Sequence, residues 1–343
     1  MLPRFIKRRF ANDLAVDLGT ANTLVYVKGQ GLAVNEPSVI AVRRNGRGDR
    51  RVLAVGKEAK MMVGRTPGNI EVIRPMKDGV IADFEGAEIM LRQLIRKAHT
   101  GRNLGWPRII VGVPSGITPV ERNAVREAAH SAGASDVFLI DQAIAAAIGA
   151  DLPVTEPACS MVVDIGGGTT QVAVMSLAGI VYSRSVRGGG NKMDDAIMQY
   201  VKQKYNLLIG EQFAETIKTT IGNALADEVI EYLQIRGLHI ASGIPRSITI
   251  DSHGVCEAIS ESVKVIVETV KQALEEIPPE LSADLIERGI VLTGGVALLK
   301  NLDRLLHRET QVPIRVADDP LSAVALGAGK ALDIGDILNQ ILN

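Results

Sequence analysis

Two stretches of the sequence combine residue types that suit phosphate binding. Asp17–Thr23 and Asp164–Thr170 both run Asp, apolar residue, Gly, three residues, Thr, between apolar segments that favour strands. Glycines leave backbone amides open to an anion, threonines add hydroxyl donors, and an aspartate at a strand end can hold a metal-bound water. We therefore expect two hairpins whose turns bind phosphate.

One glycine-rich turn alone would equally fit an ordinary hairpin with a flexible tip. The second copy indicates two similar halves that each contribute one hairpin to a shared cleft. Neither copy ends in Gly-Lys-Ser/Thr, so the pattern is not that of a P-loop.

The composition sets the class of protein. The 343 residues, 46% hydrophobic and 22% charged, are enough for two lobes with their own cores. A net charge of −1 argues against a nucleic-acid partner, which requires clustered Lys and Arg. Two cysteines are too few for a disulfide framework, and we find neither a signal-peptide pattern nor an apolar run of about 20 residues. We expect a cytoplasmic protein.

The first ten residues hold four basic residues and no acidic one. As a helix, this segment would carry one apolar stripe and suit an anionic membrane surface. The alternative is a frayed tail or the start of a strand. A second candidate for membrane contact is the Trp106 loop, whose aromatic ring could instead pack on the core. The apolar residues expected at the membrane are Leu2, Phe5, Ile6, Phe10, Leu104 and Trp106.

Strand-like and helix-like periods alternate along the chain, which predicts an α/β fold with helices covering sheets. Thr118 and Glu121 form a capping box around a first-turn proline. A proline-containing segment over 153–157 suggests the junction of two lobes. We expect helices over 84–98, 118–132, 143–150, 193–205, 211–225, 256–276 and 319–332, and strands over 108–113, 137–140, 229–235, 246–250, 289–292 and 314–316.

Two further features suggest ligand contacts. Glu215 and Lys218 are spaced to share one helix face, where the ordinary interpretation is a surface salt bridge worth less than about 1 kcal/mol. The glycines of Thr293-Gly294-Gly295 follow a predicted strand and would present backbone to a ligand at the sheet edge.

The two hairpins, the junction Asp141-Gln142-Ala143 and Thr293-Gly294-Gly295 together resemble the actin-like ATPase superfamily. Residues 12–29, 35–39, 64–70 and 74–84 are similar to the MreB family of bacterial cell-shape actins. The similarity runs from about residue 12 to residue 332.

The resemblance implies an actin-like fold with two lobes, each with an RNase-H-like inner subdomain and a smaller outer one, around a nucleotide cleft. It divides the chain into a membrane-binding segment over 1–11, lobe I over 12–152, lobe II over 153–335 and a tail over 336–343.

The resemblance also implies ATP and Mg²⁺ as cofactors. Asp17 and Asp164 would hold the metal through water, and Gln142, Asp17, Asp164 and Thr169 would act in hydrolysis. The nucleotide contacts implied are Gly19, Thr20, Ala21, Asn22, Gly166, Gly167, Gly168, Thr169, Glu215, Thr216, Ile217, Lys218, Gly294, Gly295, Val296 and Ala297.

The implied function is an ATP-dependent filament that maintains rod shape. Such filaments consist of paired antiparallel protofilaments at the inner face of the cytoplasmic membrane, bind anionic lipid, and guide the elongation wall-synthesis machinery with RodZ, MreC and MreD.

Four residues depart from the family pattern. Gln142 and Gln171 stand where the family has Glu, Asn191 replaces an Asp, and Val296 replaces a glycine. A neutral Gln can orient the attacking water but cannot deprotonate it, so hydrolysis should be slow. Val296 would cost about 1–2 kcal/mol if that glycine has a positive φ.

Three alternatives remain. A sugar or acetate kinase would require a second substrate pocket, for which we find no carboxylate set. A DnaK-type chaperone would require a peptide-binding domain. A pseudo-ATPase that copolymerises without significant hydrolysis would account for the four altered residues.

Overall fold

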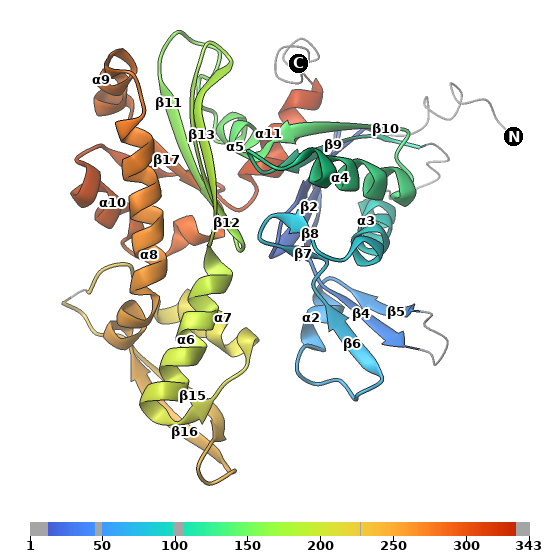
Figure 1. Cartoon of the computed structure of the whole chain (residues 1–343), viewed down its shortest axis with the longest axis vertical. Helices are drawn as coiled ribbons and strands as arrows, with labels where there is room; N and C mark the ends of the chain where they lie inside the picture. Colours follow the sequence, from blue (N-terminus) through green and yellow to red (C-terminus); the bar gives the residue numbers. More distant parts are fainter. Residues whose placement is uncertain (1–12, 45–49, 99–105, 227, 334–343) are drawn as a thin grey trace, which may run out of the picture.

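The computed structural model describes residues 13–44, 50–98, 106–226 and 228–333. These residues form two halves that lie side by side, each with a five-stranded sheet and a smaller three-stranded sheet (Figure 1). The predicted α/β class is therefore confirmed.

The five-stranded sheet of the first half has the order β10-β9-β1-β2-β3. Strands β1, β2 and β3 form an antiparallel meander, while β9 and β10 run parallel to β1. The bounds are β1 Leu14–Leu18, β2 Asn22–Val27, β3 Gly31–Pro37, β9 Arg108–Val113 and β10 Asp136–Asp141.

The second half repeats this topology in the order β13-β12-β11-β17-β18. Strands β11, β12 and β13 form the meander, and β17 and β18 run parallel to β11. The duplication predicted from the two Asp-Φ-Gly-x-x-x-Thr motifs is thus a duplication of whole sheets. The bounds are β11 Ser160–Ile165, β12 Thr169–Ser176, β13 Gly179–Arg187, β17 Ile290–Thr293 and β18 Ile314–Val316.

Smaller sheets extend from the same end of each half (Figure 1). The first half carries β5-β4-β6 and a two-stranded β7-β8 ribbon, and the second carries β14-β15-β16. The bounds are β4 Ile40–Arg44, β5 Arg50–Val55, β6 Ile70–Ile73, β7 Met76–Lys77, β8 Val80–Ile81, β14 Leu207–Leu208, β15 Tyr232–His239 and β16 Pro245–Asp251.

Helices cover both large sheets. Apolar residues of α3 and α4 complete the core of the first half, and those of α6, α7 and α8 complete the core of the second. The capping box of Thr118 and Glu121 is present at the start of α4, as predicted. The bounds are α2 Lys57–Met61, α3 Phe84–Ala98, α4 Pro119–Ala132, α5 Gln142–Gly149, α6 Gly190–Tyr205, α7 Glu211–Ile221, α8 Ser252–Glu275, α9 Pro279–Arg288, α10 Leu302–Thr310, α11 Ala323–Asp333 and the 3-10 helix η1 Gly295–Leu298.

A third core joins the two halves. Small residues of α5 and α11 pack together and bury apolar side chains from both large sheets, including Ala15 and Ile110 on one side and Val162 and Ala173 on the other. Helix α11 lies within the range predicted for lobe II, yet it packs on β1 and β9 of the first half. The chain therefore returns to its first half at residue 323.

The contact of α5 with α11 depends on the absence of side chains. A Cβ on Gly327 would lie 1.8 Å from the Ala145 carbonyl oxygen, so Gly327→Ala must separate the helices. We expect this variant to lose about 2–3 kcal/mol of unfolding free energy in urea denaturation. Gly68→Ala, where a Cβ would contact nothing within 4 Å, is the matched control. Equal midpoints for the two variants would contradict the close packing.

Several predicted boundaries were wrong. The strand expected over 229–235 is Tyr232–His239, and the helix expected over 211–225 ends at Ile221. The sequence did not predict α9, which follows Pro278 and has Pro279 in its first turn. After Gly294 the chain forms the short 3-10 helix η1, which the sequence also did not predict.

Candidate functional site

Strand alternation places two aspartates on the faces that the halves share. In β1, Leu14, Val16 and Leu18 enter the core of the first half, so Asp17 lies on the opposite face with Ala15. In β11, Met161, Val163 and Ile165 enter the core of the second half, and Asp164 shares the opposite face with Val162. Each aspartate is thus carried to the junction of the halves by the two-residue period of its strand.

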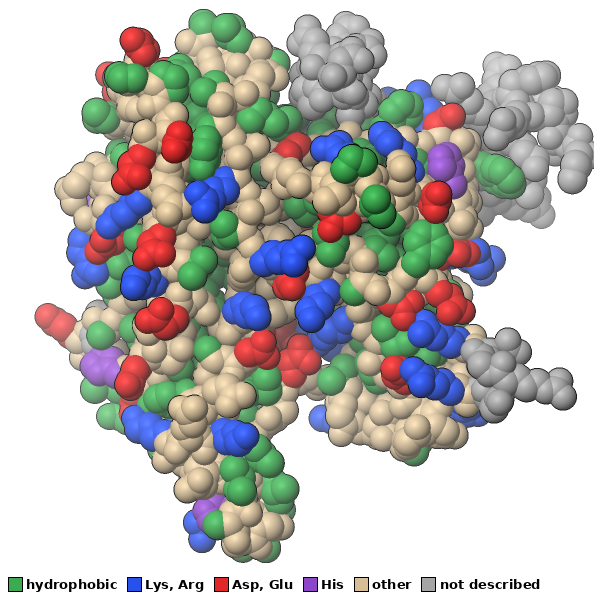
Figure 2. All heavy atoms as spheres, viewed as in Figure 1, with side chains coloured by type: hydrophobic (Ala, Val, Ile, Leu, Met, Phe, Trp, Pro, Cys, Tyr) green, Lys and Arg blue, Asp and Glu red, His purple; other side chains and the backbone are tan. Residues whose placement is uncertain are grey.

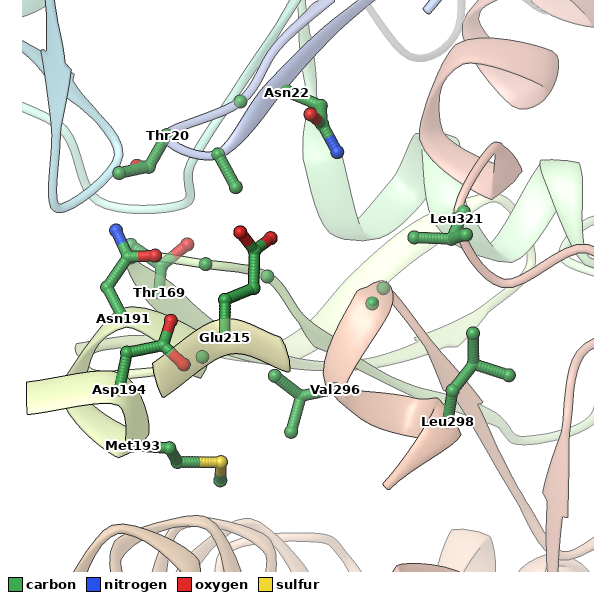
Figure 3. A pocket seen from close by; sticks show the side chains of 18 of the residues that line it. Thr20, Asn22, Thr169, Asn191, Met193, Asp194, Glu215, Val296, Leu298 and Leu321 are labelled. Atoms are coloured by element: carbon green, nitrogen blue, oxygen red, sulfur yellow. The ribbon is translucent and has the colours of Figure 1, made fainter. Parts of the chain in front are cut away.

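The two hairpin turns, one with a single glycine and one with three, face each other across this junction (Figure 3). A Cβ on Gly168 would lie 2.5 Å from the Thr20 hydroxyl oxygen, and one on Gly167 would lie 2.7 Å from the Ala21 Cβ. Only glycine allows this approach. The tip of the β7-β8 ribbon closes one side, where the Gly79 amide donates to the Thr20 hydroxyl over 2.9 Å.

A cavity of about 420 Å³ opens between the hairpins, which is large enough for a small-molecule ligand. Most of the residues predicted from the sequence line it. These are Asp17, Gly19, Thr20, Ala21, Asn22, Gln142, Asp164, Gly166, Gly167, Gly168, Thr169, Glu215, Lys218, Gly294, Gly295 and Val296.

Three predicted nucleotide contacts do not line the cavity. Ile217 is fully buried in the core of the second half, and Ala297 is also buried there. The Thr216 hydroxyl donates to the Gln212 carbonyl of its own helix. Helical geometry explains the difference for α7, since residues 215 and 218 share the face toward the cavity while 216 and 217 lie on others.

Both aspartates of the cavity have raised pKa values. Burial, and then the charge of Asp164, raise the pKa of Asp17 to about 7, against a lowering contribution from the Gln142 amide. Burial raises the pKa of Asp164 to about 6, opposed by the Thr293 hydroxyl, which donates over 2.9 Å. Two adjacent carboxylates that are costly to ionise are suited to bind a cation, since its charge would favour both ionised forms.

The surface salt bridge considered as the ordinary interpretation of Glu215 and Lys218 does not form, because each side chain has another partner. Lys218 donates to Asp194 over 2.8 Å and to the Gly190 carbonyl over 2.9 Å. Burial raises the pKa of Asp194 to about 6, although the charge of Lys218 opposes the shift. Lys218 therefore fixes the start of α6 beside the second hairpin. Asp194 carries no local sequence signal that would have identified this role.

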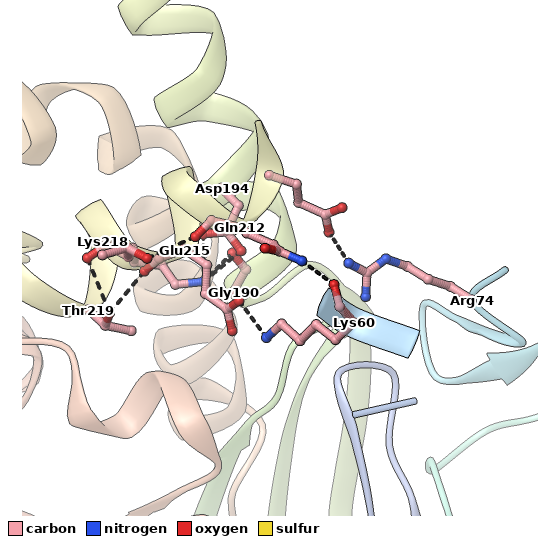
Figure 4. Close-up of polar contacts among 10 residues, drawn as sticks. Lys60, Arg74, Gly190, Asp194, Gln212, Glu215, Lys218 and Thr219 are labelled. Atoms are coloured by element: carbon pink, nitrogen blue, oxygen red, sulfur yellow. Dashed lines mark hydrogen bonds and ion pairs between the residues drawn. The ribbon is translucent and has the colours of Figure 1, made fainter. Parts of the chain in front are cut away.

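Glu215 instead pairs with Lys60 of the first half, over 2.6 Å (Figure 4). Arg74 pairs with Glu211 over 2.5 Å, and the Gln212 amide donates to the Lys60 carbonyl. We call these three contacts the cross-cleft bridge. Figure 2 shows basic and acidic side chains facing each other where the lower parts of the halves meet. Sequence reasoning missed the bridge, because its partners are far apart in the chain.

The opposite end of the cavity is apolar. Val296, Leu298 and Leu321 line it from the turn after β17 and from the segment before α11 (Figure 3). Val296 lies in η1 and is not among the residues with positive φ, so the strain considered for this substitution does not arise. An apolar slot beside a polar, glycine-lined region suits a ligand with a flat ring at one end and charged groups at the other.

Two of the remaining altered residues, Gln142 and Gln171, are hydrogen-bonded to each other. The Gln142 amide donates to Asp17 over 3.0 Å, and the Gln171 amide donates to the Gln142 carbonyl oxygen over 2.7 Å. Asn191 lines the cavity beside Gly167. Gln171 itself is fully buried behind Gln142. The structure thus joins two residues that the sequence presented separately.

Most of the predicted membrane contacts lie outside the described residues, namely Leu2, Phe5, Ile6, Phe10 and Leu104. Trp106 is described and is 50% exposed. Within the described part of the chain, no helix has the length and apolar character needed to cross a membrane. The same residues contain no cluster of three or more His, Cys, Asp or Glu side chains arranged for a metal.

A family model and individual relatives point to the same group of proteins. The MreB/Mbl protein family model matches residues 11–340. The cell shape-determining protein MreB of Escherichia coli K12 is 56% identical over 339 residues, which cover 98% of this chain and 97% of that protein. The cell shape-determining protein Mbl of Bacillus subtilis 168 is 50% identical over 329 residues, or 96% and 98% of the two chains.

Among solved structures, MreB5 of Spiroplasma citri bound to AMPPNP superposes with a TM-score of 0.89 at 36% identity, covering 96% of this chain and 98% of that one. The actin-like fold expected from the sequence is therefore confirmed. Since the family model spans nearly the whole sequence and the identities extend over almost all of it, the chain belongs to the MreB/Mbl family of cell shape-determining proteins.

Proposed function

We propose that this chain is an ATP-dependent, actin-like filament protein that maintains rod cell shape. The observation that carries the proposal is the cavity between the two hairpin turns, with Asp17 and Asp164 at its polar end. Nucleotide-bound MreB5 supports it, since that relative shares the fold over nearly the whole chain. The resemblance implies filaments of paired antiparallel protofilaments.

The residues present fit Mg-ATP. The turns at Thr20 to Asn22 and Gly166 to Thr169 line the cavity and would bind phosphates through backbone amides and hydroxyls. The Gly166 amide is an exception, since it donates to the Thr169 carbonyl over 2.9 Å. Asp17 and Asp164 would hold Mg²⁺ through water, and the metal would neutralise phosphate charge when bound. The apolar slot at Val296, Leu298 and Leu321 would take the base.

Hydrolysis, in this proposal, depends on Gln142. Its amide lies beside Asp17 and can orient a water, but unlike a Glu it cannot remove a proton. Turnover should therefore be slow. A second candidate function, a nucleotide-binding subunit that copolymerises without significant hydrolysis, is favoured by the pairing of two neutral amides, Gln142 and Gln171, at this site.

We further propose that the filament lies at the inner face of the cytoplasmic membrane and organises elongation wall synthesis with RodZ, MreC and MreD. The support is the basic, apolar-striped segment over 1–11 together with the half-exposed Trp106. A single segment would bind lipid weakly, whereas many on one filament would bind well.

One experiment separates these proposals. Purified protein is incubated with Mg-ATP and vesicles containing anionic lipid, and the same sample is assayed for phosphate release and for pelleting with and without vesicles. Pelleting with release is the expected result. Pelleting without release would favour the non-hydrolysing subunit. The absence of both pelleting and phosphate release would refute the filament proposal.

The cross-cleft bridge should slow nucleotide escape. Lys60→Met removes the pairing with Glu215 and is expected to speed dissociation of bound nucleotide about three- to tenfold, because one partly exposed ion pair contributes about 1 kcal/mol. Stopped-flow displacement of a fluorescent ADP measures the rate. Lys57→Met, which changes an exposed lysine of the same helix, should leave it unchanged. Identical rates in all three proteins would exclude the bridge as a barrier.

A further inference from the structure

We propose that Gln171 is a positioning residue that fixes which end of the Gln142 side-chain amide faces Asp17. It does so through a one-way chain of hydrogen bonds that begins at the Ser115 backbone. The inference rests on the proposed function and assigns to Gln171 a role in the same site.

The hydrogen-bond chain consists of three bonds. The Ser115 amide donates to Gln171 Oε1 over 3.3 Å, Gln171 Nε2 donates to Gln142 Oε1 over 2.7 Å, and Gln142 Nε2 donates to Asp17 Oδ1 over 3.0 Å. Gln171 is fully buried and Gln142 is 6% exposed. Water therefore has little room to replace either partner, so each of the two side chains needs the other to satisfy this hydrogen bond.

The direction of the chain follows from its first donor. A backbone N–H can only donate, so the oxygen of Gln171 must face Ser115 and its NH₂ group must face Gln142. The oxygen of Gln142 must then accept, which leaves its NH₂ group for Asp17. Turning either amide over would bring two donors together at Ser115 or two oxygens together at Asp17.

Ser115, at one end of the hydrogen-bond chain, is itself hydrogen-bonded to the start of α5, the helix that carries Gln142. The Ser115 hydroxyl donates to Asp141 Oδ2 over 2.5 Å, and Asp141 Oδ1 accepts from the Ala143 amide as the N-cap of α5. Gln142 is the first residue of that helix. Asp141 thus holds the backbone of Gln142 in place while Gln171 holds its side chain.

The need for such a device arises from the amide itself. The two oxygens of a carboxylate are equivalent, so a Glu at position 142 would present the same group in either orientation. An amide has one donor end and one acceptor end, and a water-orienting role requires the correct one. Gln171 therefore compensates for the presence of Gln at position 142.

The test is a double-mutant cycle read in both kcat and nucleotide affinity. Gln171→Met keeps the side-chain length and removes the donor, so we expect kcat for phosphate release to fall about tenfold while the Kd for Mg-ADP stays within about twofold. In the Gln142→Glu background, where orientation no longer matters, the same change should lower kcat less than about twofold. Equal losses in both backgrounds, or none in either, would overturn the inference.

Two further measurements keep the result interpretable. Gln171→Glu, which also removes the donor, should reproduce the tenfold loss if Gln171→Met folds poorly. In nucleotide-free protein, Gln171→Met and Gln142→Met should lower the melting temperature by less together than the sum of their separate effects. Additive shifts would count against a direct link. Absence of turnover in wild-type protein would overturn the proposed hydrolysis as well. Normal wild-type turnover, with the same effect of Gln171→Met on kcat in both backgrounds, would overturn this inference alone.

Discussion

The Asp17→Asn variant is expected to bind Mg-ADP about 100-fold more weakly than wild-type protein, yet to be more stable when no nucleotide is bound. The loss of affinity follows because one of two carboxylates that would face the metal loses its charge. The gain in stability follows because the ionised Asp17 carboxyl is costly in the folded protein, where burial and the charge of Asp164 raise its pKa to about 7.

The stability of the nucleotide-free protein depends on pH through Asp17. The pKa of Asp17 rises from 3.8 to about 7 on folding, so between these values the folded state holds a proton that the unfolded state has released. Stability therefore falls as the pH rises from about 4 to about 7. Part of the Asp17 side chain is open to the cavity, which reduces the cost, and we expect about 2 kcal/mol at pH 8.

Urea denaturation of nucleotide-free protein at pH 4.5 and pH 8 tests this prediction. Asp17→Asn should exceed wild type at pH 8 and approach it at pH 4.5, while calorimetry at pH 8 should show the lost affinity for Mg-ADP. Asp195→Asn, which changes an exposed carboxyl on α6, is the control and should have neither effect. A variant less stable than wild type at pH 8 would contradict the assignment of Asp17 as a costly charge.

The Gly168→Val variant is expected to lose at least about 100-fold in nucleotide affinity. A Cβ at this position would lie 2.5 Å from the Thr20 hydroxyl oxygen and 2.9 Å from two carbons of the same side chain. Contacts this short force the two hairpin turns apart, and groups that bind phosphate lose their effect when displaced by about 1 Å. The loss should be in affinity more than in folding, because both turns face the cavity.

Fluorescent-nucleotide titration measures the effect, with circular dichroism melting as the check on folding. Gly68→Val is the matched control, since a Cβ there would contact nothing within 4 Å. Near-normal affinity in Gly168→Val would mean that the hairpins do not hold the ligand between them.

The sequence was most informative where function depends on local pattern. The two Asp-Φ-Gly-x-x-x-Thr motifs predicted hairpins, and the two-residue period of a strand then fixes the face on which Asp17 and Asp164 lie. The capping box at Thr118 and the helix over 84–98 also follow from local signals, and both are present. These features could be predicted because neighbouring residues in the chain determine them.

Contacts between distant residues left no such signal. Nothing near Lys60 indicates that it meets Glu215, and the helix-spacing rule pointed instead to Lys218. Ser115 lies in the turn after β9, Gln142 in α5 and Gln171 in β12, so their hydrogen bonds form only in the folded protein. Ala297 was expected in the cavity only because the family resemblance implied it, whereas in the structure it lies buried in η1.

We propose that the cavity between the hairpins binds one Mg-nucleotide per chain. The most direct measurement is isothermal titration calorimetry of nucleotide-free protein with AMPPNP, in the presence of Mg²⁺ and with EDTA. We expect one site with a Kd in the range of about 1–100 μM, weakened at least about tenfold by EDTA and at least about 100-fold in Gly168→Val. No binding by wild-type protein, or equal binding by Gly168→Val, would contradict it.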